Sequence, residues 1–377
     1  MPGSHERALE ALLRRGRLRA LEPRRGIDFA SNDYLGLAQS AELHDAVLSA
    51  LDRGVPIGAG GSRLLRGNHS EHEALEAEAA AFFGAETALF FGGGFVANTA
   101  IFSTLPARGD LIVHDALIHA SAHEGMRLSK ADAVSVAHND PQAFEDAIKT
   151  WRANGGSGQA WIAVESLYSM DGDRAPLDDL FAVANRNEAM LVIDEAHATG
   201  VFGPDGRGFG AHLDGRGNVI SLHTCGKALG VMGALVLAPR EIRDFLVNRA
   251  RSFIYATAPS PLVAATVRAA LELARREPQR RGELHKRIAF AARELSAKSR
   301  IEISGSQIQP VIVGSDARAV ALADALKGQG YDIRAIRPPT VPEGTARLRL
   351  TITLNTSEAQ LAAVINSIEA AIAELAA

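Results

Sequence analysis

The chain has 377 residues, of which 47% are hydrophobic and 22% are charged, a composition typical of a globular protein. Its net charge of -4 gives no sign of a general affinity for nucleic acid or for an anionic membrane surface. No apolar run approaches the roughly 20 residues that a membrane-spanning helix needs. The only cysteine, Cys225, excludes an internal disulfide framework and favours a reducing compartment. We therefore expect a cytoplasmic protein.

The N-terminal segment 5–25 is rich in arginine, but acidic residues interrupt it and it has no continuous apolar core. Neither a secretory signal nor a transit peptide is expected from this pattern. Leu9, Leu12 and Leu13 recur on one helical face. The segment therefore predicts an amphipathic arm, and we assign residues 1–39 to it.

A large domain, 40–274, is predicted from short apolar runs that alternate with helix-length amphipathic stretches. Near-continuous apolar strands separated by helices are typical of a mostly parallel sheet covered on both faces. The connection between 222 and 234 is too short and too glycine-rich for a parallel crossover, so we expect the strand after it to run antiparallel. The predicted strands are 88–91, 111–114, 133–136, 161–164, 190–194, 219–222 and 234–238.

A smaller α+β domain is predicted over residues 275–377. It begins with a long helix over about 280–299 and ends with a second helix. Between them lie strands 308–313, 331–336 and 346–353, with a helix between the first two. The fold class expected for the whole chain is therefore α/β with a smaller α+β C-terminal domain.

Asp194 ends the apolar strand 190–194. In a parallel sheet, ligands bind outside the carboxyl ends of the strands, where this side chain would lie. Because a buried and unpaired carboxylate is costly, such an aspartate normally faces a cation or strong donors, and a protonated pyridine nitrogen would serve. The alternative is that Asp194 is the N-cap of the next helix.

Lys227 follows another apolar strand and lies between Gly226 and Gly230. Glycines allow a ligand to approach the backbone closely, and a partly desolvated lysine can be neutral long enough to form an imine. Thr224, three residues earlier, could donate to a phosphate. The alternative is an ordinary solvated lysine.

Three further positions follow predicted strands. The glycines at 92–94 run into helical sequence, so we expect an anion such as a phosphate at the backbone of Gly94 and Phe95; a simple tight turn is the alternative. His119 could stack on a planar ring or be a structural histidine. Ser169 could contact a cofactor or be a turn serine before Asp171.

Other classes of function are less well supported. The glycines of segment 58–63 do not follow a clear strand or open a helix, so a dinucleotide-binding turn is not expected. His69 and His72 have a spacing that could place them on one helix face, but no further ligands accompany them, so a capping role is favoured over a metal site. A hydrolase is not favoured because the sequence contains no G-x-S-x-G elbow.

Taken together and in this order, these motifs resemble the α-oxoamine synthases, a family of fold-type-I pyridoxal-phosphate transferases. The resemblance covers nearly the whole chain. The final segment resembles the 8-amino-7-oxononanoate synthase branch more closely than the branches that make aminoketobutyrate, aminolevulinate or ketosphinganine. The matching segments are 31–37, 58–76, 92–98, 114–121, 165–177, 193–203, 224–230 and 337–353.

The resemblance implies a role for each cofactor residue. Lys227 matches the Schiff-base lysine, Asp194 the partner of the pyridine nitrogen, and His119 the residue that stacks on the ring. His197 matches the residue that bonds the phenolic oxygen of the ring. The remaining matches are the phosphate-binding backbone of Gly94 and Phe95 and the cofactor contacts Ser169 and Thr224. No metal ligand is implied.

The resemblance also implies substrate contacts and an activity. Asn32 and Arg349 match groups around the substrate carboxylate, Thr340 matches another substrate contact, and Arg19 matches an arginine near the acyl substrate. The implied activity is condensation of L-alanine with pimeloyl-CoA or pimeloyl-ACP in biotin biosynthesis, by a cytoplasmic homodimer that contacts neither nucleic acid nor membrane. The alternatives are another α-oxoamine synthase, of the glycine C-acetyltransferase or aminolevulinate synthase type, and a non-catalytic partner subunit. The presence of both Lys227 and Asp194 argues against the partner subunit.

Overall fold

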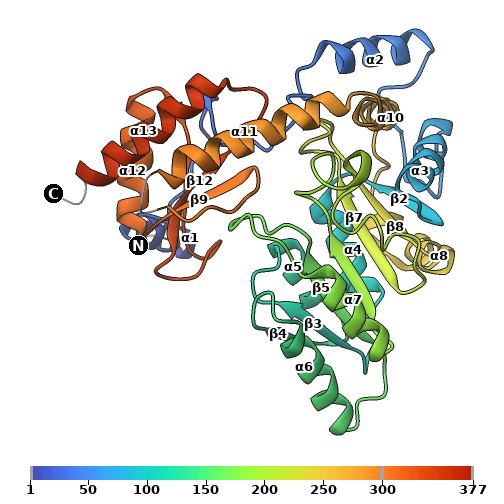
Figure 1. The fold of residues 1–377 in the computed structure, drawn as a ribbon. Helices are drawn as coiled ribbons and strands as arrows, with labels where there is room; N and C mark the ends of the chain where they lie inside the picture. Colours follow the sequence, from blue (N-terminus) through green and yellow to red (C-terminus); the bar gives the residue numbers. More distant parts are fainter. Residues whose placement is uncertain (1–2, 298–300, 375–377) are drawn as a thin grey trace. The chain divides into compact units, whose positions relative to one another are not determined.

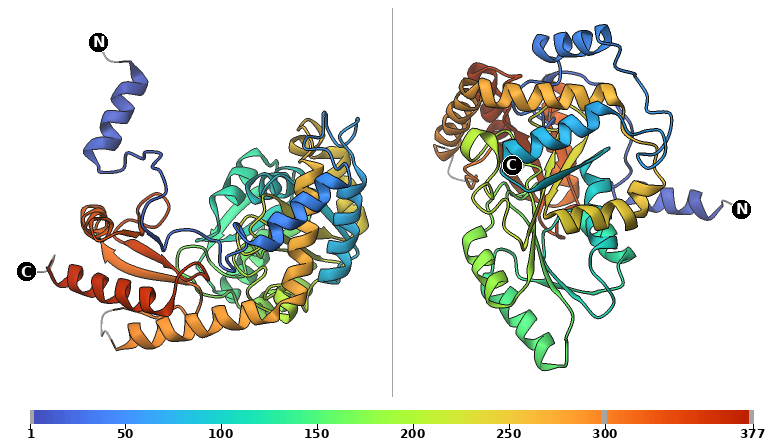
Figure 2. Two further views of the ribbon diagram at one scale, coloured as in Figure 1. Left: turned by 90° about the horizontal axis from the view of Figure 1, so that it is seen from above. Right: turned by 90° about the vertical axis from the view of Figure 1, so that its right-hand side faces the viewer.

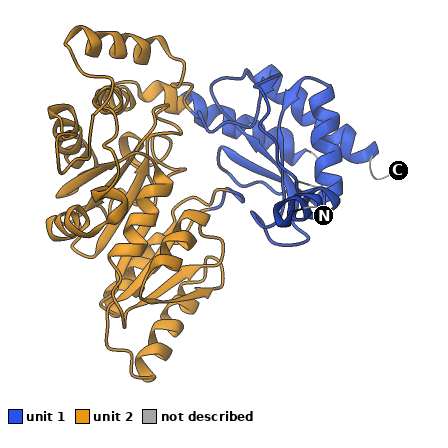
Figure 3. Ribbon diagram, turned by 180° about the vertical axis from the view of Figure 1, so that it is seen from behind, with its two compact units in different colours: residues 1–34, 170–173, 283–377 blue, residues 35–169, 174–282 orange. Residues whose placement is uncertain are grey.

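The computed structural model describes residues 3–297 and 301–374. These residues form two compact units, drawn in orange and blue in Figure 3. Unit 2 comprises residues 35–169 and 174–282, and unit 1 comprises the described parts of 1–34, 170–173 and 283–377. The domain ranges predicted from the sequence overlap these units, but the N-terminal segment and residues 170–173 group with the C-terminal residues.

Unit 2 contains a seven-stranded sheet in the order β2-β8-β7-β6-β5-β3-β4. All neighbouring strands are parallel except β8, which is antiparallel to both β2 and β7, as the short connection predicted. The α/β fold expected from the sequence is thus confirmed. The strands are β2 (Thr87–Phe91), β3 (Leu111–Asp115), β4 (Asp132–Val136), β5 (Ala160–Glu165), β6 (Met190–Asp194), β7 (Val219–Thr224) and β8 (Ala234–Ala238).

Alternating residues of the central strands supply two hydrophobic cores on opposite faces of this sheet. On β6, Val192 joins one core and its neighbours Leu191 and Ile193 join the other. Helices α4 and α5 pack in the first core, and α6 and α7 pack in the second. Helices therefore cover both faces (Figures 1 and 2), which explains why the strands read as continuous apolar runs.

The helices of unit 2 begin with recognisable start signals. Ser40 and Asp140 cap α2 and α6 through their side chains, and a proline stands at the first position of α6 and α10. The bounds are α2 (Ala41–Asp52), α3 (Ser70–Phe83), α4 (Gly94–Thr104), α5 (Ala120–Leu128), α6 (Pro141–Ala153), α7 (Leu177–Arg186), η1 (Pro204–Gly206), α8 (Arg240–Arg249), α9 (Arg251–Ile254), α10 (Pro261–Arg276) and α11 (Pro278–Ser296), within which the unit boundary falls.

Unit 1 is built on an antiparallel three-stranded sheet in the order β11-β12-β9. A two-residue strand near the N-terminus, β1, pairs in parallel with β10. The helices of this unit are α1, α12, α13 and the later part of α11. The bounds are α1 (Ser4–Arg14), β1 (Ile27–Asp28), β9 (Ile308–Gly314), α12 (Asp316–Gly328), β10 (Tyr331–Asp332), β11 (Arg334–Ile336), β12 (Ala346–Thr351) and α13 (Glu358–Glu374).

Unit 1 differs from the sequence prediction in three places. The expected strand 331–336 is two strands, because its first residues pair with β1 and its last residues pair with β12. The expected strand 346–353 ends at Thr351; Ile352 N still donates to Gln307 O, but by Leu354 the backbone has turned to bond Tyr34 O instead. The predicted helix 280–299 runs from Pro278 to Ser296, and its last two predicted positions lie outside the described residues.

The amphipathic N-terminal helix is present as α1, but it buries none of its own residues. Leu9 and Leu13 on its apolar face are both more than half exposed. None of the helices in residues 3–297 and 301–374 combines the length and the apolar character that crossing a membrane requires.

Candidate active site

Three polar residues end neighbouring parallel strands at the carboxyl edge of the unit 2 sheet. Glu165 ends β5, Asp194 ends β6 and Thr224 ends β7. The register pairs Glu165 directly with Asp194. This is the edge at which ligands bind in parallel sheets, so the expected placement of Asp194 is met.

Asp194 is buried, and each of its two carboxylate oxygens accepts a hydrogen bond. The Oδ2 atom accepts from Asn98 Nδ2 at 2.7 Å, and Oδ1 accepts from the backbone of Ala196 at 2.9 Å. The interpretation of Asp194 as a helix N-cap is wrong, because turns follow it and the next helix begins only at Pro204. A buried carboxylate that is held by neutral donors retains its negative charge for a ligand.

Lys227 lies in a tight turn after β7, with its amine 2.8 Å from His197 Nε2. The turn is closed by a hydrogen bond from Gly230 N to Lys227 O at 2.9 Å. Gly230 has a φ of +69°, and a Cβ atom there would meet Ala38 N at 2.5 Å. Glycine is therefore required at this position, and the turn holds the lysine at the same sheet edge as Asp194.

Helix α4 begins at Gly94, separated from the end of β2 by Gly92 and Gly93, and Gly93 is its N-cap residue. The cap supplies no side-chain acceptor, so the first backbone N–H groups of the helix are available to an anion. A Cβ atom at Gly94 would meet Thr224 Cγ2 at 2.6 Å, so glycine allows the helix start to approach β7. The side chain of Phe95 is half exposed, and Thr224 Oγ1 makes only a long bond, 3.4 Å, to Ala196 O.

His119 is the N-cap of α5. Its Nδ1 accepts a hydrogen bond from the backbone of Ser121 at 3.2 Å and lies 2.8 Å from Ser121 Oγ. A nitrogen that accepts from an N–H carries no proton, so the imidazole is neutral with its proton on Nε2. The side chain of His119 remains exposed, but partial desolvation by its surroundings lowers its pKa; the negative charge of Asp194 opposes this shift, and the positive charge of Lys227 adds to it.

A chain of hydrogen bonds joins His119 to Asp194 through two residues that the sequence analysis did not single out. Asn98 Nδ2 donates both to Asp194 Oδ2 and to Ser121 Oγ, the latter at 2.9 Å. Asn98 lies one helical turn after Gly94, so the helix that begins at the glycines also supplies this donor. The position of Asn98, four residues after Gly94 in the same helix, is the sequence signal that could have identified it as a site residue.

Ser169 is buried, and its backbone donates to Glu165 Oε2 at 3.2 Å. After Ser169 the chain leaves unit 2 for four residues, and Leu167 and Arg174 pair as an isolated bridge on either side of this excursion. Glu165 was also missed in the sequence analysis. The rule that identified Asp194, a carboxylate at the end of an apolar strand, applies to it equally.

In unit 1, the predicted substrate residues Asn32 and Arg349 are joined through Tyr34. The hydroxyl of Tyr34 donates to Asn32 Oδ1 at 3.1 Å and accepts from Arg349 Nη2 at 3.5 Å. Arg349 lies on β12, is buried, and also donates to Thr351 Oγ1 at 3.0 Å. Tyr34 is fully buried and was not predicted as a site residue.

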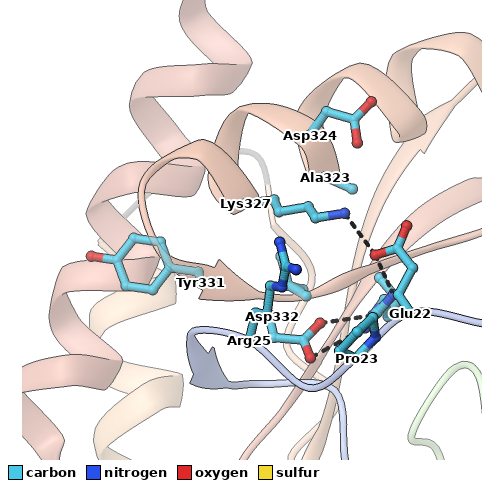
Figure 4. A pocket seen from close by; sticks show the side chains of 10 residues that line it. Glu22, Pro23, Arg25, Ala323, Asp324, Lys327, Tyr331 and Asp332 are labelled. Carbon is cyan, nitrogen blue, oxygen red and sulfur yellow. Dashed lines mark hydrogen bonds and ion pairs between the residues drawn. The ribbon is translucent and has the colours of Figure 1, made fainter.

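The other two predicted substrate residues also lie together in unit 1. Arg19 Nη2 donates to Thr340 Oγ1 at 3.4 Å, and both side chains are exposed. A separate pocket of this unit, between residues 22–25, α12 and β10, contains none of the predicted site residues (Figure 4). The charges in that pocket are largely paired with one another, as in the 2.6 Å contact between Lys327 and Glu22.

The two histidines considered for a metal have capping roles. His69 is the N-cap of α3 and accepts from Glu71 N at 3.2 Å, while His72 Nδ1 accepts from His69 N at 3.1 Å. The other ring nitrogen of His72 lies 2.7 Å from Pro259 O. The glycines at 58–63 lie in a loop between α2 and α3, without the strand and helix that a dinucleotide-binding turn requires.

Comparison with known proteins places this geometry in a family. The model of the family "Aminotransferase class I and II" matches residues 24–368. The chain belongs to the class I and II aminotransferase family.

Relatives and solved structures of this family match nearly the whole chain. The 8-amino-7-oxononanoate synthase of Chromobacterium violaceum is 43% identical over 92% of this chain and 89% of its own length. That of Anaeromyxobacter dehalogenans is 39% identical over 97% of this chain and 95% of its own length.

Among solved structures, the Sphingomonas wittichii serine palmitoyltransferase is 30% identical with a TM-score of 0.86, covering 92% of this chain and 87% of its own. The 8-amino-7-oxononanoate synthase of Francisella tularensis is 28% identical with a TM-score of 0.79. The match covers 93% of this chain and 99% of that protein's chain. The family predicted from the sequence motifs is therefore confirmed.

The environment of His119 predicts how it titrates. In the cofactor-free protein, the pKa of His119 should lie below the ordinary value of 6.5, because partial desolvation and the charge of Lys227 disfavour the imidazolium. An NMR titration of the histidine resonances measures this, with a His119→Gln variant to assign the signal. A midpoint at or above 6.5 would contradict the neutral form.

Proposed function

We propose that this protein binds pyridoxal 5'-phosphate and condenses L-alanine with a pimeloyl thioester, of coenzyme A or acyl-carrier protein, to 8-amino-7-oxononanoate. Carbon dioxide and the free thiol are the other products, and the reaction belongs to biotin biosynthesis. The observation that carries the proposal is the Lys227 amine, 2.8 Å from His197 at the sheet edge where the buried Asp194 ends β6. The two 8-amino-7-oxononanoate synthases that match over about nine tenths or more of the chain support the choice of substrates.

The residues at this edge fit pyridoxal phosphate by the chemistry of their donor set. Lys227 offers an amine for the aldehyde, Asp194 a negative charge for the ring nitrogen, and His197 an imidazole for the phenolic oxygen. The unpaired N–H groups at the start of α4, around Gly94 and Phe95, are suited to the phosphate. When bound, the cofactor supplies an electron sink for the α-carbon of the amino acid.

The chain's own groups handle the proton of the reaction. The amine of Lys227, in its neutral form, takes the α-proton of alanine and returns a proton to the same carbon after loss of carbon dioxide. The negative charge of Asp194, maintained by Asn98 and Ala196, keeps the ring nitrogen protonated. His119 would lie over the ring, and its Nε2–H group would be a donor for the alanine carboxylate.

The substrate carboxylate and the thioester are assigned to residues of unit 1. Arg349 and Asn32 bind the carboxylate of alanine, and the guanidinium of Arg349 provides a two-pronged donor for it. Tyr34 holds both side chains in place through its hydroxyl. Arg19 and Thr340 contact the acyl substrate, and Ser169 and Thr224 complete the cofactor contacts.

We also propose that the protein works as a cytoplasmic homodimer. The only cysteine, Cys225, is fully buried, which suits a reducing compartment. Phe95, Met232 and Tyr255 in unit 2 are large apolar side chains that are more than half exposed. A second copy of the chain that covered these side chains would remove their apolar surface from water.

The substrate assignment predicts the outcome of a steady-state panel. L-Alanine, glycine and L-serine are each combined with thioesters of several chain lengths, and release of carbon dioxide and thiol is measured. Alanine with a pimeloyl thioester should give the highest kcat/KM. A preference for glycine with a shorter thioester would indicate another α-oxoamine synthase, and no release from any pair would indicate a non-catalytic subunit.

The assignment of Lys227 predicts the result of its removal. Lys227→Ala should abolish the visible absorbance of the lysine-bound cofactor and lower turnover by at least about a thousandfold, because it removes both the amine that holds the cofactor and the base. Lys130→Ala, at an exposed lysine of the same unit, should change neither. Retention of the absorbance and of turnover in Lys227→Ala would refute the assignment.

The assignment of Arg349 predicts a selective loss of amino-acid binding. Arg349→Ala should raise the KM for alanine by about ten- to a hundredfold, the usual worth of a hydrogen bond to a charged group, with a smaller effect on the KM for the thioester. Tyr34→Phe should also raise the KM for alanine, by about two- to tenfold, because it removes the hydroxyl that bonds both Arg349 and Asn32. The exposed Arg318 gives a matched control, Arg318→Ala, which should leave both constants unchanged. Unchanged alanine dependence in Arg349→Ala would count against the role.

A further inference from the structure

Two carboxylates lie side by side at the active edge of the unit 2 sheet. Glu165 and Asp194 are paired in the register of β5 and β6, and both are buried, with 1% and 7% of their surface exposed. The residues two positions earlier, Ala163 and Val192, are also paired and join the same hydrophobic core. Because side chains two residues apart share a face, Glu165 and Asp194 both point toward the face covered by α4 and α5.

The two carboxylates are not equally supplied with donors. Each oxygen of Asp194 accepts a hydrogen bond, one from Asn98 and one from Ala196. Glu165 accepts a single backbone bond on Oε2, from Ser169 at 3.2 Å, and its Oε1 has no hydrogen-bond partner within the described parts of the chain. A buried charge with one oxygen unpaired is costly, whereas a neutral acid at the same place loses far less on burial.

The charges that face Glu165 come from three neighbouring elements. Asp194 at the end of β6 and Asp115 at the end of β3 disfavour a negative charge on it, and Lys227 after β7 favours one. Burial is the largest influence and, with the charge of Asp194, raises the pKa of Glu165 well above its usual range. Adjacent carboxylates that cannot both ionise divide one charge between them.

We propose that Glu165 is a neutral carboxylic acid at pH 7, so that the pair carries one negative charge and that charge belongs to Asp194. In the context of the proposed function, on which this consequence rests, a single anion faces the ring nitrogen. A second anion would stabilise the ammonium form of Lys227 and reduce the fraction of neutral amine. Glu165 is thus a positioning residue, which holds the backbone of Ser169 without adding charge.

An infrared difference spectrum between the wild-type protein and Glu165→Gln tests the protonation state. Without cofactor or substrate at pH 7, the wild type should show the C=O stretch of one protonated carboxylic acid that the variant lacks. Burial raises the pKa of Glu195 to about 7 and that of Asp214 to about 6, but both groups are present in both proteins and cancel. Absence of the band would overturn the proposal and leave the proposed function untouched, because no reaction is measured.

A second measurement uses the cofactor-loaded protein. If Glu165 is neutral, Glu165→Gln leaves the charge unchanged, and the pH midpoint of the lysine-bound cofactor's absorbance should stay within a few tenths of a unit. If Glu165 is charged, its neutralisation lowers that midpoint by about a unit or more, and this result would overturn the proposal. Asp194→Asn, which removes the charge of the pair, is the positive control and should lower the midpoint.

A comparison of two substitutions separates the neutral acid from a merely space-filling side chain. Glu165→Ala removes the acceptor of Ser169 and should weaken cofactor binding, whereas Glu165→Gln keeps an acceptor and should restore it. Equal loss in both variants would contradict the proposal. If Glu165→Gln does not fold, carbon-13 NMR of wild-type protein labelled in its glutamate carboxyl groups replaces the spectra; if no glutamate besides Glu195 remains protonated at pH 7, the proposal falls.

Discussion

The buried negative charge of Asp194 is the constraint on which the other residues at the carboxyl edge of the unit 2 sheet depend. A carboxylate in this position must be compensated, and the fold compensates it with two neutral donors, Asn98 and Ala196. Neutral donors stabilise the charge without cancelling it, as the proposed role of Asp194 opposite a protonated ring nitrogen requires. The amine of Lys227 and the imidazole of His197 lie at the same edge because β6 and β7 are parallel neighbours.

One helix serves both ends of the proposed cofactor. The start of α4 at Gly94 presents unpaired N–H groups, and Asn98 one turn later reaches Asp194 and Ser121. Through Ser121 the same amide group influences His119, whose Nδ1 must then act as an acceptor. A single helix therefore contributes to the proposed phosphate site, to the hydrogen bonding of Asp194 and, through Ser121, to the tautomer of His119.

Residues 170–173, which directly follow Ser169, are held by contacts within unit 1. Residues 170–173 belong to unit 1, where Asp171 forms an ion pair with the buried Arg347 of β12. Gly172 has a φ of +71°, and a Cβ atom there would meet Ile308 O at 2.1 Å, so only glycine fits. Arg347 is two residues from Arg349, which means that one strand anchors this segment and carries the proposed carboxylate-binding arginine.

Much of the fold and of the candidate site was determined by the sequence alone, because it rests on local rules. Apolar runs predicted the parallel strands, and a short glycine-rich connection predicted that β8 is antiparallel. Strand ends and glycine turns predicted the placement of Asp194, Lys227 and Gly94.

Only the tertiary structure decided the remaining features of the site, because they depend on which groups meet across the chain. Asn98 and Ser121 became partners of Asp194 and His119, Tyr34 came to join Asn32 and Arg349, and strand pairing divided residues 331–336 between two sheets. No local pattern could place Glu165 beside Asp194, since the register of β5 and β6 is set by the packing of residues far apart in the sequence.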